Sequence, residues 1–189
     1  MIRSKLAAML ALAVSLVGVA AVAQKGGGLR YSSIAASSAL TNSTTETTLD
    51  TFTLAADELK AGDVVHIKAG GIATATNSTD TLQLKVKIGG TVVIATAAVD
   101  VADNDIWTID TDVVVRTDGP SGTFYANGVQ QLGVEGTATM RQDHVVSSAI
   151  DTTAALAVII TGTWSVASAS NSCRNDMFIV EIKRPYTQD

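Results

Sequence analysis

The stretch that decides the fold is Leu82-Gln83-Leu84-Lys85-Val86-Lys87-Ile88. Apolar and polar side chains alternate along it without a break, so one face is aliphatic and the other is polar. Successive side chains of a β-strand point to opposite faces, whereas an amphipathic helix repeats its apolar residues every three or four positions. The stretch therefore predicts a half-buried strand whose aliphatic side chains face a core.

The same alternation recurs on both sides of this stretch. It is clear at 65–69, 107–115 and 178–182, and weaker at 49–54, 91–97, 123–126, 137–141 and 154–163. Turn-forming residues separate the runs, namely Lys60-Ala61-Gly62-Asp63, Gly70-Gly71, Gly89-Gly90, 118–122 and Asn127-Gly128. Roughly eight to ten short strands with one apolar face each need a second sheet to cover them. The sequence predicts an all-β protein with a two-sheet antiparallel sandwich, and a jelly roll is the favoured path of the chain.

Composition excludes several classes of protein. The chain has 189 residues, of which 47% are hydrophobic and 16% are charged. That charged fraction is too low for a disordered chain or a coiled coil. The net charge of −5 argues against a nucleic-acid-binding surface, which needs clustered Lys and Arg. The single cysteine excludes an internal disulfide framework.

The N-terminus is a separate unit. Arg3 and Lys5 precede the apolar run 6–23, which ends in Ala21-Val22-Ala23. A basic start, an apolar middle and a small-residue end are typical of a secretory signal peptide, although a run of about 18 residues also suffices for a membrane-spanning helix. The predicted organisation is a signal peptide or hydrophobic anchor helix at 1–23, a Gly-rich linker at 24–29 and a β-sandwich domain at 30–189.

Residues that carry chemistry are sparse. The histidines His66 and His144 lack the companions that a zinc site needs, and the chain has no Gly-x-Ser-x-Gly nucleophile elbow. Cys173 precedes Arg174, which can lower a thiol pKa, but a small half-buried residue at the start of a strand is the simpler interpretation. We therefore expect no enzymatic activity.

The acidic stretch Asp100-Val101-Ala102-Asp103-Asn104-Asp105 is the one candidate metal site. Calcium binds several carboxylate and carbonyl oxygens from a turning loop, and Asp100, Asp103 and Asp105 supply part of such a shell. The stretch lacks the spacing of an EF-hand loop and its distal Glu, so an ordinary Asx-rich turn is the alternative interpretation. No other cofactor is expected.

Glycan-related signals are weak. Asn42-Ser43-Thr44 and Asn77-Ser78-Thr79 match the N-glycosylation pattern, which arises easily by chance in a chain rich in Ser and Thr. A glycan-binding platform needs neighbouring exposed aromatic side chains. The strand patterns assign Trp107, Phe124 and Phe178 to the core, and leave Tyr31, Tyr125 and Tyr186 open, far apart in sequence.

Longer phrases of the sequence resemble a known group of proteins. They are 59–65, 71–82, 98–106, Val114-Val115-Arg116-Thr117, Ser121-Gly122-Thr123-Phe124 and 164–174. Together, over residues 30–183, they resemble small jelly-roll virion structural proteins of tailed bacteriophages and prophages. The resemblance implies a capsid decoration, spike or fibre component that forms a homo-oligomer, with a trimer favoured, and that contacts other virion proteins.

The functional expectation is a non-enzymatic virion structural protein located in the virion. The predicted signal peptide favours an alternative function after its cleavage. The protein would then be a secreted or cell-surface binding module for host-surface glycans, or an extracellular filament subunit. Neither nucleic acid nor membrane is an expected partner, except that residues 6–23 contact a membrane if they are retained.

Overall fold

The computed structural model describes residues 26–76, 79–133, 139–146 and 149–185, with the backbone alone for 139–144. The described residues form twelve strands and no helix. Within these ranges, no helix is long and apolar enough to cross a membrane. The predicted signal peptide or anchor helix at 1–23 lies outside the described residues.

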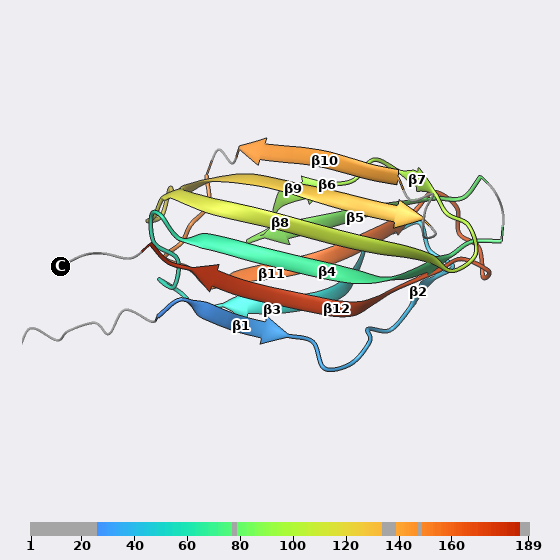
Figure 1. Ribbon diagram of the computed structural model, residues 1–189, viewed down its shortest axis with the longest axis horizontal. Coiled ribbons are helices and arrows are strands. Elements are labelled where there is room, and N and C mark those ends of the chain that lie inside the picture. Colours follow the sequence, from blue (N-terminus) through green and yellow to red (C-terminus); the bar gives the residue numbers. More distant parts are fainter. Residues whose placement is uncertain (1–25, 77–78, 134–138, 147–148, 186–189) are drawn as a thin grey trace, which may run out of the picture.

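The strands form two sheets (Figure 1). The seven-stranded sheet has the order β1 (Gly28–Ser32), β12 (Ser172–Lys183), β4 (Val64–Thr74), β8 (Asp105–Thr117), β9 (Thr123–Gly133) and β10 (Thr139–Val146), with β2 (Leu40–Thr41) also paired to β12. The five-stranded sheet has the order β3 (Thr47–Leu54), β11 (Leu156–Trp164), β5 (Thr81–Ile88) and β6 (Thr91–Ala95), with β7 (Val99–Asp100) also paired to β5.

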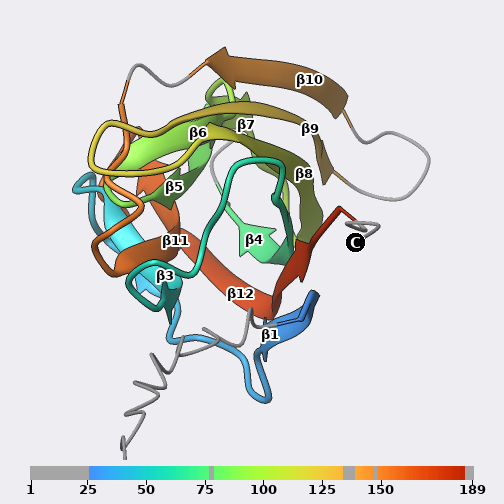
Figure 2. The same ribbon diagram turned by 90° about the vertical axis from the view of Figure 1, so that its left-hand side faces the viewer.

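The two sheets lie face to face as the layers of a sandwich (Figure 2). All strand pairs are antiparallel. The layers approach each other laterally, because β10 contacts β6 on one side and β12 contacts β3 on the other. The predicted all-β, antiparallel two-sheet architecture is therefore confirmed.

The core fills the space between the layers. The seven-stranded sheet contributes Trp107 and Phe124, among others, and the five-stranded sheet contributes Trp164 and Leu54. Each buried indole keeps a hydrogen bond, since Trp107 Nε1 donates to the Arg174 carbonyl at 3.2 Å and Trp164 Nε1 donates to the Leu40 carbonyl at 3.4 Å. Burying large apolar side chains while pairing their polar atoms is what stabilises a sandwich of this size.

Strand β5 shows how directly the sequence pattern sets the faces. Its aliphatic side chains, Leu82, Leu84, Val86 and Ile88, are all buried. The sequence pattern predicted that the polar side chains of the opposite face are fully exposed to solvent, and the structure differs. Lys85 and Lys87 are half-buried, and both form ion pairs with Glu46, which lies just before β3.

Two predicted turn signals are wrong. Gly70-Gly71 lies inside β4 and Asn127-Gly128 lies inside β9. A Cβ atom at Gly71 would strike the Arg174 carbonyl beside the bulge in β12, and one at Gly128 would strike Ile94 of the other sheet. These glycines permit close approach of neighbouring chain segments. In contrast, Gly89 and Gly90 have φ angles of 56° and 83° and form the predicted turn between β5 and β6.

Three strands were not predicted from the sequence. These are β1, β2 and β7, which are short and carry little alternation. Strand β1 begins at Gly28, inside the segment 24–29 that was predicted as a linker. Strand β10 covers 139–146 instead of 137–141. Short edge strands are set by the partner strand beside them, so local pattern alone identifies them poorly.

Candidate functional site

The outer face of the seven-stranded sheet carries an apolar row that crosses four strands. Strand register places Val64 opposite Val114, Val114 opposite Tyr125, and Tyr125 opposite Val146. Val146 is 58% exposed and Val114 is 36% exposed. We call these four residues the apolar row. The guanidinium of Arg116 lies over the Tyr125 ring, 5.1 Å from its centroid, and borders the row on one side.

A polar row follows on the next register positions of the same face. His66 of β4 lies opposite both Asp112 of β8 and Glu181 of β12. The His66 Nδ1 atom is 2.9 Å from Asp112 Oδ1 and 3.7 Å from Asp110 Oδ1, and Lys183 Nζ is 3.8 Å from Asp112 Oδ1. The predicted position of His66 on the polar face of its strand is confirmed.

The second histidine belongs to the same line of register positions. His144 of β10 pairs with Asn127, which in turn pairs with Asp112. The backbone thus aligns His144, Asn127, Asp112, His66 and Glu181 across five strands. An apolar row with a charged and amide-rich border has the composition of a protein contact surface, in which an apolar centre is surrounded by a polar rim.

The cysteine is part of the core. Cys173 is fully buried, and that burial raises the pKa of its thiol to about 12, so the side chain is a protonated core residue. In the part of the chain that the structure describes, no three His, Cys, Asp or Glu side chains are grouped so that they could hold a metal ion.

The three aspartates of the calcium candidate differ in exposure. Asp100 and Asp103 are exposed, and Asp100 pairs with Thr81 through the backbone of β7. Asp105 is buried, and its Oδ2 accepts a hydrogen bond from the Ala102 amide at 2.8 Å. The stretch therefore forms a turn closed by Asp105, which agrees with the alternative interpretation made from the sequence.

The aromatic residues that the strand patterns assigned to the core are buried there. Trp107, Phe124 and Phe178 are buried. Tyr31 is half-buried and stacks on Phe52, with ring centroids 5.2 Å apart. Tyr186 lies outside the described residues. Of the two glycosylation sequons, Asn42 is exposed and Asn77 lies outside the described residues.

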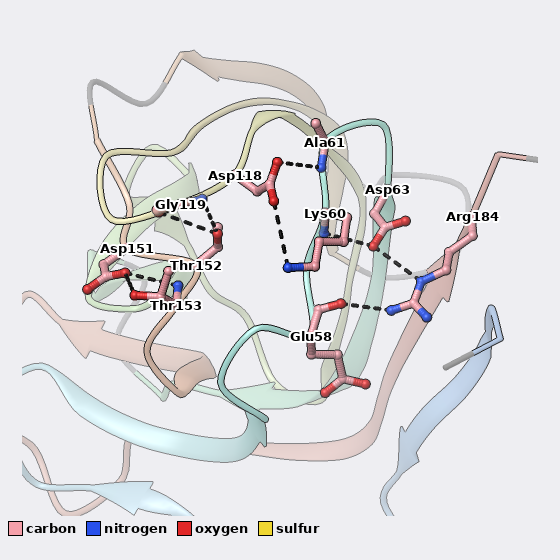
Figure 3. A network of polar contacts seen from close by, with 10 residues as sticks. All are labelled: Glu58, Lys60, Ala61, Asp63, Asp118, Gly119, Asp151, Thr152, Thr153 and Arg184. Carbon is pink, nitrogen blue, oxygen red and sulfur yellow. Dashed lines mark hydrogen bonds and ion pairs between the residues drawn. The ribbon is translucent and has the colours of Figure 1, made fainter. Parts of the chain in front are cut away.

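One end of the sandwich is closed by a network of buried charges (Figure 3). Arg184 Nε donates to Asp63 Oδ2 at 3.3 Å, and Arg184 Nη2 donates to the Glu58 carbonyl at 2.7 Å. The Glu58 side chain accepts from Arg30 Nε at 2.7 Å and from the Ala55 amide at 2.9 Å. The N-terminal strand and the C-terminal segment are thereby both tied to the connection between β3 and β4.

The rest of this end is held by turn contacts around Gly119. Thr152 accepts from the Gly119 amide at 2.8 Å, and its own amide donates to the Gly119 carbonyl at 3.0 Å. Asp118 accepts from the Ala61 amide at 3.3 Å and lies 3.7 Å from Lys60 Nζ (Figure 3). These contacts join three loops of one end.

Sequence reasoning missed the buried acids of both ends. Asp63 and Glu58 at one end, in or beside a predicted turn, and Asp80 at the other end, just before the predicted strand 82–88, are all buried. The hydrophobic pattern carries no signal for them, since a turn aspartate looks the same whether solvent or another loop covers it.

Comparisons with known proteins identify no relative. No protein-family model, no curated protein and no solved structure matches this chain.

Proposed function

We propose that the protein is a non-enzymatic virion structural protein, a decoration, spike or fibre component, that assembles with copies of itself. The resemblance of residues 30–183 to phage structural proteins suggests this class. The two-sheet sandwich supports it, and the proposal includes a jelly-roll path of the chain. The observation that carries the proposal is the apolar row on the outer face of the seven-stranded sheet.

The apolar row suits contact with a second copy of the chain. Its exposed valines are β-branched side chains with little rotamer freedom, so burying them costs little side-chain entropy. The neighbouring polar row presents carboxylates beside His66 and Lys183, which gives a patch of mixed charge. Mixed charge allows two equivalent copies to face each other without net repulsion.

Sedimentation velocity at micromolar concentration tests this assignment. We expect the wild type to sediment as an oligomer, with a trimer favoured, and Val146→Lys and Val114→Lys to shift it toward the monomer. Val166→Lys is the matched control, because Val166 is a similarly exposed valine, 44% exposed, on the β11–β12 connection. A wild type that is monomeric at these concentrations, or a control that dissociates equally, contradicts the proposed interface.

A second candidate function is an extracellular filament subunit or a secreted binding module. The N-terminal leader favours export, and the segment 28–41 runs as an added edge along β12. Between β1 and β2, Ser33 and Ser37 continue the pairing with β12, because their amides donate to the carbonyls of Phe178 and Asn175 at 2.8 and 2.7 Å. Such an edge segment is the kind of element that subunits exchange.

The intact mass and N-terminal sequence of the native protein distinguish the two candidates. A mature start at Gln24 supports export and the second candidate. A retained N-terminus in protein that co-purifies with particles supports the virion assignment.

A further inference from the structure

The end of the sandwich at β2 and β7 contains a buried pair of polar side chains with unused oxygens. Asp80, which precedes β5, is 1% exposed, and Asn171, which precedes β12, is 0% exposed. Asn171 Nδ2 donates to Asp80 Oδ2 at 3.0 Å and to the Val166 carbonyl at 3.3 Å. Both amide hydrogens are therefore used, while Asp80 Oδ1 and Asn171 Oδ1 have no partner.

A second buried carboxylate lies at the same end. Asp105 begins β8, and its Oδ1 also lacks a partner. The connection between β7 and β8 joins it to Asp80, since the Val101 amide donates to the Asp80 carbonyl at 3.3 Å and the adjacent Ala102 amide donates to Asp105 Oδ2 at 2.8 Å. The connection between β7 and β8 thus contacts both aspartates, Asp80 through its backbone carbonyl and Asp105 through its side chain, and each aspartate keeps one buried oxygen without a partner.

The missing partner of these oxygens has a definite chemistry. All three atoms are acceptors once the two aspartates are ionised, so only a donor or a cation complements them. Among the described residues, no Lys, Arg or His forms an ion pair with Asp80 or Asp105. Buried carboxylates without a positive partner are costly, and proteins compensate them by pairing or by metal coordination.

We propose that Asp80, Asn171 and Asp105 form a calcium-binding site at this end of the sandwich. Carboxylate and amide oxygens are the ligands that Ca²⁺ prefers, and its six to eight positions tolerate irregular geometry completed by backbone carbonyls and water. Mg²⁺ demands a near-ideal octahedron and loses its water reluctantly, so it suits this buried group less well. The exposed Asp100 and Asp103 are outside the proposed site.

Two measurements on the full chain test the site. The first is the thermal unfolding midpoint, Tm, in EDTA and in Ca²⁺. At a Ca²⁺ concentration of a hundred times Kd, we expect a rise in Tm of about 5–10 °C for a chain of this size. The second is Tb³⁺ luminescence excited through tryptophan. Trp164 pairs with Leu82, two residues from Asp80, so it lies close enough to sensitise a bound ion.

Variants assign the effect to named residues. Asp80→Asn abolishes the Ca²⁺-dependent rise in Tm and the Tb³⁺ signal, whereas Asp103→Asn, an exposed aspartate on the same connection, keeps both. Asn171→Asp adds a third carboxylate, and we expect it to lower Tm in EDTA and to enlarge the rise on adding Ca²⁺.

Several results would overturn the proposal. One is a wild type whose Tm does not change on adding Ca²⁺ and which gives no Tb³⁺ luminescence. That result would mean that water or a proton, and not a metal ion, satisfies the buried oxygens. Another is loss of binding in Asp103→Asn, which places the ion on the exposed loop instead. If Asp80→Asn does not fold, the wild-type measurements and Asn171→Asp still decide the outcome.

Discussion

The two ends of this sandwich bury acidic side chains in different ways. At one end, Asp63 is paired with Arg184, and the backbone amide of Lys60 donates to the same carboxylate oxygen at 3.0 Å. At the other end, Asp80 accepts one hydrogen bond from the neutral amide of Asn171. The first end pairs its buried acid with an arginine, whereas among the described residues no Lys, Arg or His forms an ion pair with Asp80.

The difference shows where each end obtains its stability. The arginines of the first end come from the two extremes of the described chain, Arg30 in β1 and Arg184 after β12. These contacts therefore fix the terminal segments on the sandwich. The stabilisation of that end comes from groups of the chain itself. At the second end, the proposed calcium site would make the stability depend on the Ca²⁺ concentration of the solution.

Replacing the arginine of the first end should have the largest effect. In Arg184→Met, the buried Asp63 carboxylate loses its positive partner and the Glu58 carbonyl loses a donor. We expect unfolding in urea to show a loss of about 3–5 kcal/mol, the range for breaking one side of a buried ion pair.

Arg174→Met provides the control for this loss. The pair of Arg174 Nε with Asp176 Oδ1 spans 2.9 Å on the surface, with the Arg174 side chain 49% exposed. We expect a change below about 1 kcal/mol. Equal losses in the two variants would show that the buried network contributes nothing particular to stability.

Neutralising one aspartate should destabilise the first end but not the second. Asp63→Asn leaves the buried Arg184 without its negatively charged partner and should lower the free energy of unfolding by about 2 kcal/mol. Asp80→Asn removes an uncompensated charge, and its new amide suits the unused Asn171 oxygen. In EDTA we expect it to be neutral or stabilising by about 1 kcal/mol. Parallel urea titrations check both values, and two equal losses would remove the distinction between the ends.

A half-buried acid on the five-stranded sheet gives an intermediate case. Hydrogen bonds from Lys87, Thr161 and Lys85 outweigh desolvation and lower the pKa of Glu46 to about 2. Since the unfolded value is near 4.5, the stabilisation is present above pH 4.5 and is lost as the pH falls toward 2. The Glu46 side chain is 29% exposed, so we discount the full shift and expect about 1–2 kcal/mol.

Glu46→Gln tests this contribution. The variant should be less stable than the wild type by that amount at pH 7, and the difference should shrink between pH 4.5 and pH 2. Urea unfolding at pH 7 and pH 3 measures it. A difference that is independent of pH would mean that packing, and not charge, is what the variant loses.

The exposed pair at the first end should have the smallest effect. Lys60 Nζ lies 3.7 Å from Asp118 Oδ2, and both side chains are more than a third exposed. Lys60→Met should therefore change the free energy of unfolding by less than about 0.5 kcal/mol at physiological salt. A larger loss would show that the loops at this end depend on surface charge as well as on the buried arginine.

Much of the fold follows from local pattern, and the exceptions have physical causes. The run 82–88 gives strand β5 with its faces correct, because an alternating strand has only one way to bury its aliphatic side. Gly128 looks like a hairpin turn beside Asn127, yet it lies inside β9, where a Cβ atom would strike Thr111 and Asp110 of the neighbouring strand β8 as well as Ile94 of the opposing sheet. That constraint comes from strands that the fold places beside and opposite β9, and no local signal reports it.

The sequence by itself determined the class of fold and the buried face of the main strands. These properties depend on the two-residue period of a strand and on composition, which are local. Only the tertiary structure decided which aspartates lose contact with water and which of them meet an arginine. Asp63 and Asp80 each stand just before a predicted strand in the sequence, and their difference arises because Arg184 is brought back across the chain to Asp63 and not to Asp80.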